Sequence, residues 1–272
     1  MRRKHFSNIM HKHLRELYTK ILPLSLRIKI RKILVIDQPT LPEGSIDYQS
    51  ALPESRHEYK STWNVLSRTF RQATMHVIGD VEENEIRATA EETRRVLEAS
   101  VGIKPDDVVL EIGCGIGRVG QVLAPLCKQW IGCDVSINML KHANSRLTSF
   151  NNVKLIEISG FDLSPIPEAS IDLVYCTVVF MHLDEWDRYN YILEAYRVLR
   201  PGGRIFVDNF NLCSTEGWDV FEIHRRQYPR YRPPQISKSS TPQEIEVYLK
   251  RAEFQQIRIQ EQGAWVRGLG IK

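Results

Sequence analysis

One stretch of the chain, from Val109 to Arg118, constrains the fold more than any other. It reads Val-Leu-Glu-Ile-Gly-Cys-Gly-Ile-Gly-Arg, an apolar run that carries an acid and then glycines at positions 113, 115 and 117. Glycines let the backbone turn tightly and let a ligand approach where a Cβ would stand in the way. A helix that starts here leaves free N–H groups at its first turn, suited to an anionic or polar ligand group. The stretch therefore predicts a buried strand, a ligand-binding turn and a helix.

From Asp106 onward the sequence alternates between strand-like and helix-like patterns. Such βαβ alternation predicts an α/β fold, a Rossmann-like parallel sheet with right-handed crossovers and helices on both faces. The expected elements are a strand at 108–112, a helix at 117–126, a strand at 130–133, a helix at 138–147, strands at 153–158 and 171–176, a helix at 184–199, a turn at 201–203 and a strand at 204–208.

The C-terminal end follows a different pattern. A helix is expected at Thr241–Arg251, with Thr241 as its N-cap and Pro242 at its first position. Two strands, 256–260 and 264–270, are expected to follow and to be joined by a short turn at 261–263. A closing hairpin on a parallel sheet is unusual for a dehydrogenase.

The N-terminal part is set apart by its charge. Residues 1–35 hold 10 of the 37 Lys and Arg residues and 1 of the 33 Asp and Glu residues, so the remainder has 27 bases and 32 acids. The mildly acidic body does not indicate a nucleic-acid surface. The basic segment has apolar positions at helical spacing, and two interpretations stay open: a helix on an anionic membrane surface, or a helix packed on the body with solvated charges.

These patterns divide the chain into two parts. Residues 1–55 are expected to be a basic amphipathic helical extension and linker, the linker being the proline-containing stretch 37–55. Residues 56–272 are expected to be one domain, with helices at 56–78 and 83–100 leading into a core at 105–272. The long connection at 210–240, rich in arginines and aromatics, is expected to be a lid over the acceptor or a solvated surface segment.

Cysteine usage and hydropathy bear on location. The 5 cysteines form no Cys-x-x-Cys pair, which is typical of reduced thiols in a cytoplasmic protein. No window approaches the ~18 uncharged apolar residues of a membrane span. The start Met-Arg-Arg-Lys is not followed by the apolar run of a secretory signal. The histidines at 5, 11 and 13 fit a solvated basic helix better than a metal site, and no metal is expected.

A rival pattern lies in the same glycine-rich turn. Gly115-Ile-Gly117-Arg-Val-Gly120 satisfies the dinucleotide fingerprint G-x-G-x-x-G, which would make the protein an NAD-dependent oxidoreductase. That register begins after Gly113 has already ended the strand, and it leaves Glu111 unexplained. Asp134, at the end of the second strand, can hydrogen-bond both hydroxyls of a ribose, so it supports a nucleoside without choosing between the two cofactors.

With its surroundings, the region resembles the class I S-adenosylmethionine-dependent methyltransferases, near the small-molecule branch often called type 11. The resemblance covers about 105–270 and implies a seven-stranded sheet whose last strand runs antiparallel, which agrees with the hairpin expected above. It rests on the stretches 110–118 (Leu-Glu-Ile-Gly-Cys-Gly-Ile-Gly-Arg), 132–140 (Gly-Cys-Asp-Val-Ser-Ile-Asn-Met-Leu), 162–174, 180–183 (Phe-Met-His-Leu) and 197–203 (Arg-Val-Leu-Arg-Pro-Gly-Gly).

The resemblance also implies roles for matching positions in binding S-adenosylmethionine. The loop Gly113–Gly117 would hold the methionine part, Asp134 the ribose, and Phe161 with Asp162 the adenine amine. Many relatives read Gly-Asp-Ala where this chain has Ser-Gly-Phe-Asp at 159–162, and Asp162 could instead cap a turn. Asp134 could likewise be a helix N-terminal acid. The full expected cofactor set is Glu111, Gly113, Cys114, Gly115, Gly117, Asp134, Val135, Met139, Phe161, Asp162 and Val178.

The reaction is expected beside the loop at 177–183, which follows the fourth strand, because ligands of open α/β sheets lie beyond the strand ends. Its titratable side chain is His182, and Asp208 ends the next strand. Some sugar O-methyltransferases with a similar loop use such a pair for deprotonation, so the resemblance implies His182 and Asp208 as catalytic residues. A histidine here can also simply pack against or cap the following helix. The helix at 59–74, with Tyr59 and Trp63, is a candidate to close the cofactor site from the other side.

The function expected is methyl transfer to a small-molecule acceptor, with O-methylation of a sugar, glycan or lipid-like substrate favoured. The [Asn/Asp]-Pro-Pro-[Tyr/Phe] motif of many amine methyltransferases is replaced by Cys-Thr-Val-Val at 176–179, which argues against methylation of nucleic-acid bases. An oxidoreductase and a non-catalytic cofactor-binding protein of the same fold remain the alternatives. The retained acid and glycines of the loop argue against a dead site.

Overall fold

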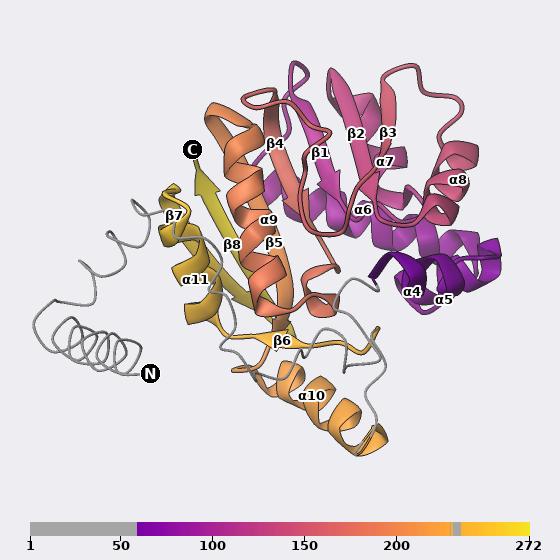
Figure 1. Ribbon diagram of the computed structural model, residues 1–272, viewed down its shortest axis with the longest axis vertical. Coiled ribbons are helices and arrows are strands. Elements are labelled where there is room, and N and C mark those ends of the chain that lie inside the picture. Colours follow the sequence, from indigo (N-terminus) through magenta and orange to yellow (C-terminus); the bar gives the residue numbers. More distant parts are fainter. Residues whose placement is uncertain (1–58, 229, 231–234) are drawn as a thin grey trace, which may run out of the picture. The chain divides into compact units, whose positions relative to one another are not determined.

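The computed structural model describes residues 59–228, 230 and 235–272. The basic segment 1–35, the linker 37–55 and the two interpretations attached to them lie outside the described residues. Within the described part, a mixed sheet is covered by helices on both faces (Figure 1). No helix in this part is both long and apolar enough to cross a membrane.

The sheet runs in the order β3-β2-β1-β4-β5-β8-β7, with the short β6 paired to β5. Its central strands are almost continuously buried, as expected of strands covered on both faces. The pairs from β3 to β5 are parallel, whereas β8 runs antiparallel to both β5 and β7, which confirms the expected closing hairpin. The strands are β1 (Val108–Ile112), β2 (Gln129–Asp134), β3 (Val153–Glu157), β4 (Ile171–Cys176), β5 (Leu199–Asn211), β6 (Ser239–Ser240), β7 (Gln255–Gln262) and β8 (Trp265–Ile271).

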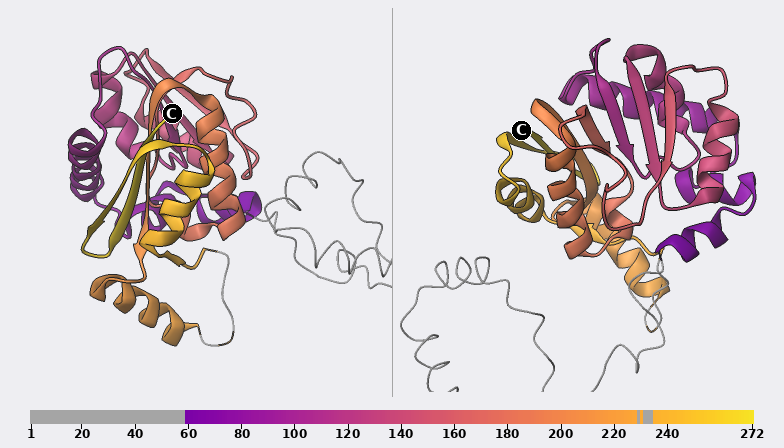
Figure 2. Two further views of the ribbon diagram at one scale, coloured as in Figure 1. Left: turned by 90° about the vertical axis from the view of Figure 1, so that its left-hand side faces the viewer. Right: turned by 45° about the horizontal axis from the view of Figure 1, so that its top comes forward.

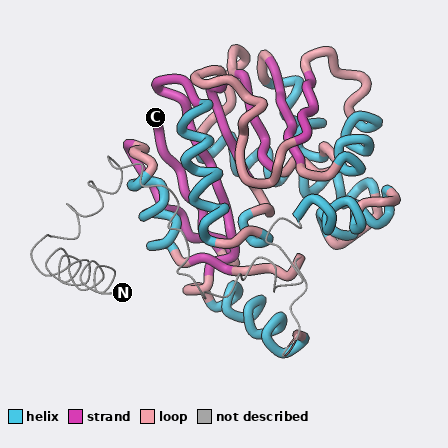
Figure 3. The backbone as a smooth tube through the Cα atoms, viewed as in Figure 1, coloured by secondary structure: helices cyan, strands magenta, loops and turns pink. Residues whose placement is uncertain are grey.

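Two apolar clusters hold the helices against the sheet, one on each face. On one face α9 (Glu185–Val198) and α11 (Pro242–Arg251) contribute residues such as Ile192 and Leu249 to the cluster. On the other face α6 (Glu83–Ser100), α7 (Arg118–Leu123) and α8 (Ile137–Arg146) pack around Trp130. The left view of Figure 2 shows these layers from the side, and Figure 3 shows strands with helices on both faces. The strand ends that carry the glycine-rich turn are therefore held rigidly from both sides.

The N-terminal helices differ from the sequence prediction in one respect. The helix expected at 56–78 is two helices, α4 (Tyr59–Leu66) and α5 (Phe70–Ile78). The break arises because Thr69 starts α5 with a capping box, in which its side chain accepts from the N–H of Gln72 and the Gln72 side chain accepts from the N–H of Thr69. The change of direction lets both helices contribute side chains to one site.

Two predicted turns are also different. The turn expected at 201–203 is part of β5, because Leu199 already pairs with Ile171 before a bulge leads into the main register. The turn expected at 261–263 is shorter, because β7 continues to Gln262 and β8 starts at Trp265. Gly263, at a φ of 54°, supplies the left-handed residue that a two-residue hairpin loop requires.

The connection at 210–240 is not simply a long loop. It holds α10 (Thr215–Gln227), which begins at the cap Ser214 and exposes most of its side chains. Gly217 is its buried residue, since a Cβ there would collide with the carbonyl oxygen of Asn211. The segment then returns to the sheet through β6, next to the end of β5. Helix α10 stands off the sheet in Figure 1.

Candidate functional site

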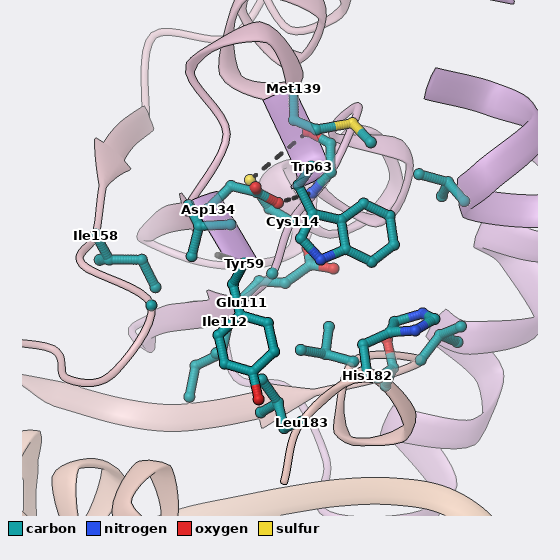
Figure 4. A pocket seen from close by; sticks show the side chains of 18 of the residues that line it. Tyr59, Trp63, Glu111, Ile112, Cys114, Asp134, Met139, Ile158, His182 and Leu183 are labelled. Carbon is teal, nitrogen blue, oxygen red and sulfur yellow. Dashed lines mark hydrogen bonds between the residues drawn. The ribbon is translucent and has the colours of Figure 1, made fainter. Parts of the chain in front are cut away.

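A pocket lies at the carboxyl ends of β1, β2 and β4, where the glycine-rich turn was expected to bind its ligand (Figure 4). Helices α4, α5 and α9 complete its walls. It is lined by Tyr59, Trp63, His76, Val77, Glu111, Ile112, Gly113, Cys114, Gly115, Arg118, Asp134, Val135, Met139, Ile158, Gly160, Thr177, Val178, Val179, His182, Leu183 and Tyr191.

The three glycines of the turn all have positive φ, at 73°, 53° and 73° for Gly113, Gly115 and Gly117. Other residues adopt this conformation only with strain, so the sequence of glycines is explained by backbone geometry. Gly113 and Gly115 line the pocket, but Gly117 does not. A Cβ at Gly117 would lie 2.9 Å from Leu147 and 3.1 Å from Ala143, so this glycine serves the packing of the turn against α8.

Asp134 is the acid at the end of β2, and it is buried at the edge of the pocket. One carboxylate oxygen accepts from the N–H of Gly115 at 2.8 Å, and the other accepts from the N–H of Ser136 at 2.8 Å. Burial raises its pKa to about 6, against the opposing effect of these N–H donors. The carboxylate thus fixes the glycine-rich turn, and its remaining lone pairs are available to hydroxyl donors of a ligand.

Glu111 lies deeper, at the end of a buried hydrogen-bonded chain. The indole N–H of Trp130 donates to the Tyr175 hydroxyl at 3.0 Å, and that hydroxyl donates to the Glu111 carboxyl at 2.5 Å. Burial raises the pKa of Glu111 to about 8, although the Tyr175 bond and the nearby Arg118 guanidinium act in the opposite direction. Without a bound cation, Glu111 is therefore mostly protonated at neutral pH, and a positively charged ligand would favour its ionised form.

The apolar slot beside Asp134 is formed by Val135, Met139, Ile158 and Gly160. Val135 and Met139 were expected there, whereas Ile158 and Gly160 were not.

Phe161 and Asp162, predicted at this position, do not line the pocket. The Asp162 carboxylate accepts from the Ser159 hydroxyl at 3.0 Å and from the N–H of Ser164 at 3.2 Å. The structure thus shows the turn-capping arrangement for Asp162.

His182 lies in the short 3₁₀ helix η3 (Phe180–His182) and lines the pocket. Its ring packs edge-on against Trp63, with 4.8 Å between ring centroids, and Figure 4 shows the two side chains next to each other. Burial lowers the pKa of His182 to about 4, with the main-chain hydrogen bond of Gln235 opposing the shift. The imidazole is therefore neutral at pH 7, and its Nδ1 is buried with no hydrogen-bond partner.

Asp208, predicted to pair with His182, does not line this pocket. Its carboxylate accepts from the N–H of Val178 at 2.7 Å and borders a neighbouring cavity instead. The structure does not bring His182 and Asp208 together in one pocket, because the main chain at 177–178 lies between the two cavities and lines both. Burial raises the pKa of Asp208 to about 6.

Helix α4 closes the pocket opposite the strand ends, as the sequence suggested for Tyr59 and Trp63. The Tyr59 hydroxyl donates to the Asp187 carboxylate at 3.0 Å and accepts from the N–H of Asp184 at 3.1 Å. These bonds attach α4 to the start of α9. His76 and Val77 of α5 were missed, because nothing in the local sequence relates this helix to strand ends more than thirty residues away.

Two further questions are whether Cys114 is reactive and whether a metal ion could bind. Cys114 lines the pocket, but burial raises its thiol pKa well above the ordinary value, so it has no reactive character. Among the described residues, no group of three or more histidines, cysteines or acids could hold a metal ion.

Comparison with known proteins gives a consistent answer. A family model described as a methyltransferase domain matches residues 110–207. A probable S-adenosylmethionine-dependent methyltransferase of Mycolicibacterium smegmatis is 34% identical over 105 residues, 38% of this chain and 38% of the relative. The 27-O-demethylrifamycin SV methyltransferase of Amycolatopsis mediterranei is 32% identical over 135 residues, 47% of this chain and 49% of the relative. This chain matches only 35–38% of the length of three curated relatives, among them the Mycolicibacterium smegmatis protein.

The fold is shared more widely than the sequence. The crystal structure of magnesium protoporphyrin IX methyltransferase from Synechocystis, with bound SAH, aligns with a TM-score of 0.58. The alignment covers 78% of this chain and 97% of that one at 16% identity, which shows a common fold and no more.

Proposed function

The chain belongs to the class I S-adenosylmethionine-dependent methyltransferase family, and we propose that it transfers the methyl group of that cofactor to a hydroxyl of a small-molecule acceptor. The observation that carries this proposal is the composition of one pocket. Asp134 and an apolar slot stand on one side of it, and the unpartnered imidazole nitrogen of His182 stands on the other.

The residues present fit S-adenosylmethionine. The slot of Val135, Met139 and Ile158 suits a flat purine, and the neighbouring Asp134 carboxylate suits ribose hydroxyls. Glu111, held neutral by burial, becomes an ionised partner once a positive group of the cofactor is near.

When bound, S-adenosylmethionine supplies a methyl carbon whose bond to the positive sulfur breaks as the bond to the acceptor oxygen forms. Alignment of donor and acceptor can account for about 7–11 kcal/mol of the barrier. The protein's own chemical step is then removal of the hydroxyl proton. A neutral His182 with Nδ1 as a free acceptor is prepared for that step. Its lowered pKa makes it a weak base, so we expect the proton to move late, when the oxygen has already become acidic.

A sugar, glycan or lipid-like acceptor is the preferred substrate class. The relative named for 27-O-demethylrifamycin SV supports an oxygen acceptor, and the residues at 176–179 lack the motif of many amine methyltransferases. Cytoplasmic location stays a proposal from cysteine usage. Contact of the basic segment 1–35 with a membrane surface is a further proposal, and nucleic acid is not an expected partner.

Calorimetry tests the cofactor class without knowledge of the acceptor. We expect S-adenosylmethionine and S-adenosylhomocysteine to bind and NADH and NADPH not to bind. The reverse selectivity would establish an oxidoreductase and overturn the proposal.

Methyl transfer from labelled cofactor to n-octyl β-D-glucopyranoside then tests His182. The change His182→Ala should lower the rate at saturating cofactor by roughly 10²–10⁴-fold. His142→Ala, at a histidine on α8 outside the pocket, is the matched control and should leave the rate unchanged. Equal rates in both variants would reduce His182 to a packing residue.

A further inference from the structure

A second cavity adjoins the first, with a volume of about 380 Å³, within the size range of small-molecule sites. It lies against the C-terminal half of β5 and the start of β8, and against α5 and α6. Val77, Arg118, Thr177 and Val178 line both cavities. The two spaces therefore meet at the loop that follows β4.

The walls of the second cavity are largely apolar. At its outer end Phe210 of β5 stacks on Trp265 of β8, with 4.8 Å between ring centroids and 25° between ring planes. Such a platform accepts the flat face of a ring through apolar contact. Its carbon-rich lining argues against a small, highly polar ligand.

The charges around the cavity balance. Arg118 donates to the Thr93 hydroxyl at 3.0 Å, and Glu92 pairs with Arg95 at 2.9 Å. Arg267 donates to the Gln262 side chain at 2.7 Å, and Asp208 accepts from the N–H of Val178 at 2.7 Å. The two cations and two acids of the lining sum to zero, so the lining has no excess charge to recognise a phosphate or carboxylate ligand.

One polar group in the shared wall has no partner. Thr177 borders both cavities and is only 7% exposed. Its side-chain oxygen is buried and makes no hydrogen bond. A buried hydroxyl without a partner is costly.

The next residue is strained. Val178 has a φ of 61°, a conformation that β-branched residues rarely adopt, and Asp208 holds it there. An unpartnered hydroxyl beside a strained residue is typical of a site that a ligand completes.

We propose that the second cavity binds the methyl acceptor, an uncharged alcohol with a ring and a large apolar part, and that the Thr177 hydroxyl donates a hydrogen bond to the oxygen that receives the methyl group. The inference rests on the proposed function and specifies its substrate class. The acceptor's ring lies on the Phe210–Trp265 stack, and its reacting hydroxyl reaches the first pocket past Thr177. The new bond joins that oxygen to the methyl carbon, the sulfur–carbon bond breaks, and the hydroxyl proton passes to His182.

The experiment measures binding of n-octyl β-D-glucopyranoside to the full chain by calorimetry, below the concentration at which it forms micelles and in the presence of S-adenosylhomocysteine. Thr177→Val, which replaces the hydroxyl by a methyl group, should raise the Kd about tenfold. Thr177→Ser keeps a hydroxyl and should restore the affinity. Thr148→Val, at an exposed threonine outside both cavities, is the control.

A second pair of variants examines the aromatic platform. Trp265→Leu should raise the Kd about fivefold, whereas Trp218→Leu on α10 should not change it. Glucose 6-phosphate should not bind, because the cavity has no excess positive charge.

Absence of saturable binding, equal losses in Trp265→Leu and Trp218→Leu, or competition between the glycoside and S-adenosylhomocysteine would each overturn the inference. Failure of S-adenosylhomocysteine itself to bind would instead refute the proposed function, so the two failures are distinguishable.

Discussion

Strands β2 and β5 each carry a buried aspartate, Asp134 as the last residue of β2 and Asp208 three residues before the end of β5, and the two differ in what the aspartate holds. Asp134 fixes the glycine-rich turn through Gly115 and the start of α8 through Ser136, beside the first pocket. Asp208 fixes the strained Val178, beside the second cavity. Burial raises the pKa of both carboxyls to about 6. On our proposal, the same side chain in similar burial thus supports a cofactor site at β2 and an acceptor site at β5.

The strongest test of this difference makes the same substitution, aspartate to asparagine, at both positions. Asp134→Asn should weaken S-adenosylhomocysteine binding at least about hundredfold, because it removes charged hydrogen bonds worth about 1.5–3 kcal/mol each and places an N–H₂ group against a backbone N–H. Asp208→Asn should change that Kd by less than about threefold, since its amide oxygen can still accept from Val178. Calorimetry with circular dichroism as a folding control measures both. Equal losses would mean that the two positions form one site.

A double-mutant cycle measures how Asp208 and Val178 together contribute to the free energy of unfolding. Asp208→Ala should lower the free energy of unfolding by about 1–3 kcal/mol, because Val178 would keep its unfavourable φ without the hydrogen bond that compensates for it. Val178→Gly removes that strain, so the double variant should lose less stability than Asp208→Ala does. Urea unfolding of the four proteins gives the coupling energy. Strict additivity would show that Asp208 does not act through Val178.

The raised pKa of Glu111, beside the first pocket, predicts how the stability of the protein depends on pH. Below its ordinary pKa of 4.5 the carboxyl is protonated in both folded and unfolded chains. Between 4.5 and about 8 the unfolded chain ionises first, so the folded state loses stability as pH rises through this window. The melting temperature of the cofactor-free protein should therefore fall from pH 5 to pH 8 by roughly 7–14 °C more than that of Glu111→Gln, because the shift corresponds to about 3.5 kcal/mol over this range. Parallel pH profiles would contradict the raised pKa.

The smallest effect is expected at Asp162, which the sequence placed in the cofactor site and the structure does not. Asp162→Ala should change S-adenosylhomocysteine affinity by less than about twofold. The Asp162 carboxylate accepts hydrogen bonds from Ser159 and Ser164 of its own turn and is attracted by the charge of Arg197. Calorimetry under the conditions used for Asp134 measures this. A loss comparable to that of Asp134→Asn would restore the family-based assignment.

The sequence predicted the β1–α7 turn, most strand positions and the closing hairpin because each is encoded locally. Buried strands are short apolar runs, and positive φ selects glycine. Thr241 and Pro242 likewise marked the start of α11 correctly. Helix α10 was missed, because it buries little and so shows no strong apolar face.

The candidate site was only partly predictable, for a related reason. Asp134 could be found because it ends the predicted strand β2, whereas Met139, which lies on α8, was expected only from the family resemblance. The second cavity joins residues such as Val77, Thr93 and Trp265 that approach one another only through the tertiary fold. Asp162 was misplaced because a side chain can satisfy its own turn instead of a ligand, and sequence spacing does not distinguish the two.

The hydrogen-bonded chain from Trp130 through Tyr175 to Glu111 has one more consequence. An indole at the end of that chain senses the charge on the carboxylate, because the phenol between them must polarise when the proton leaves. Trp130 lies against Gly120, where a Cβ would be 2.7 Å from its ring, so it is locked in a single orientation. We therefore expect the ultraviolet absorption of Trp130 to change when a ligand alters the charge on Glu111.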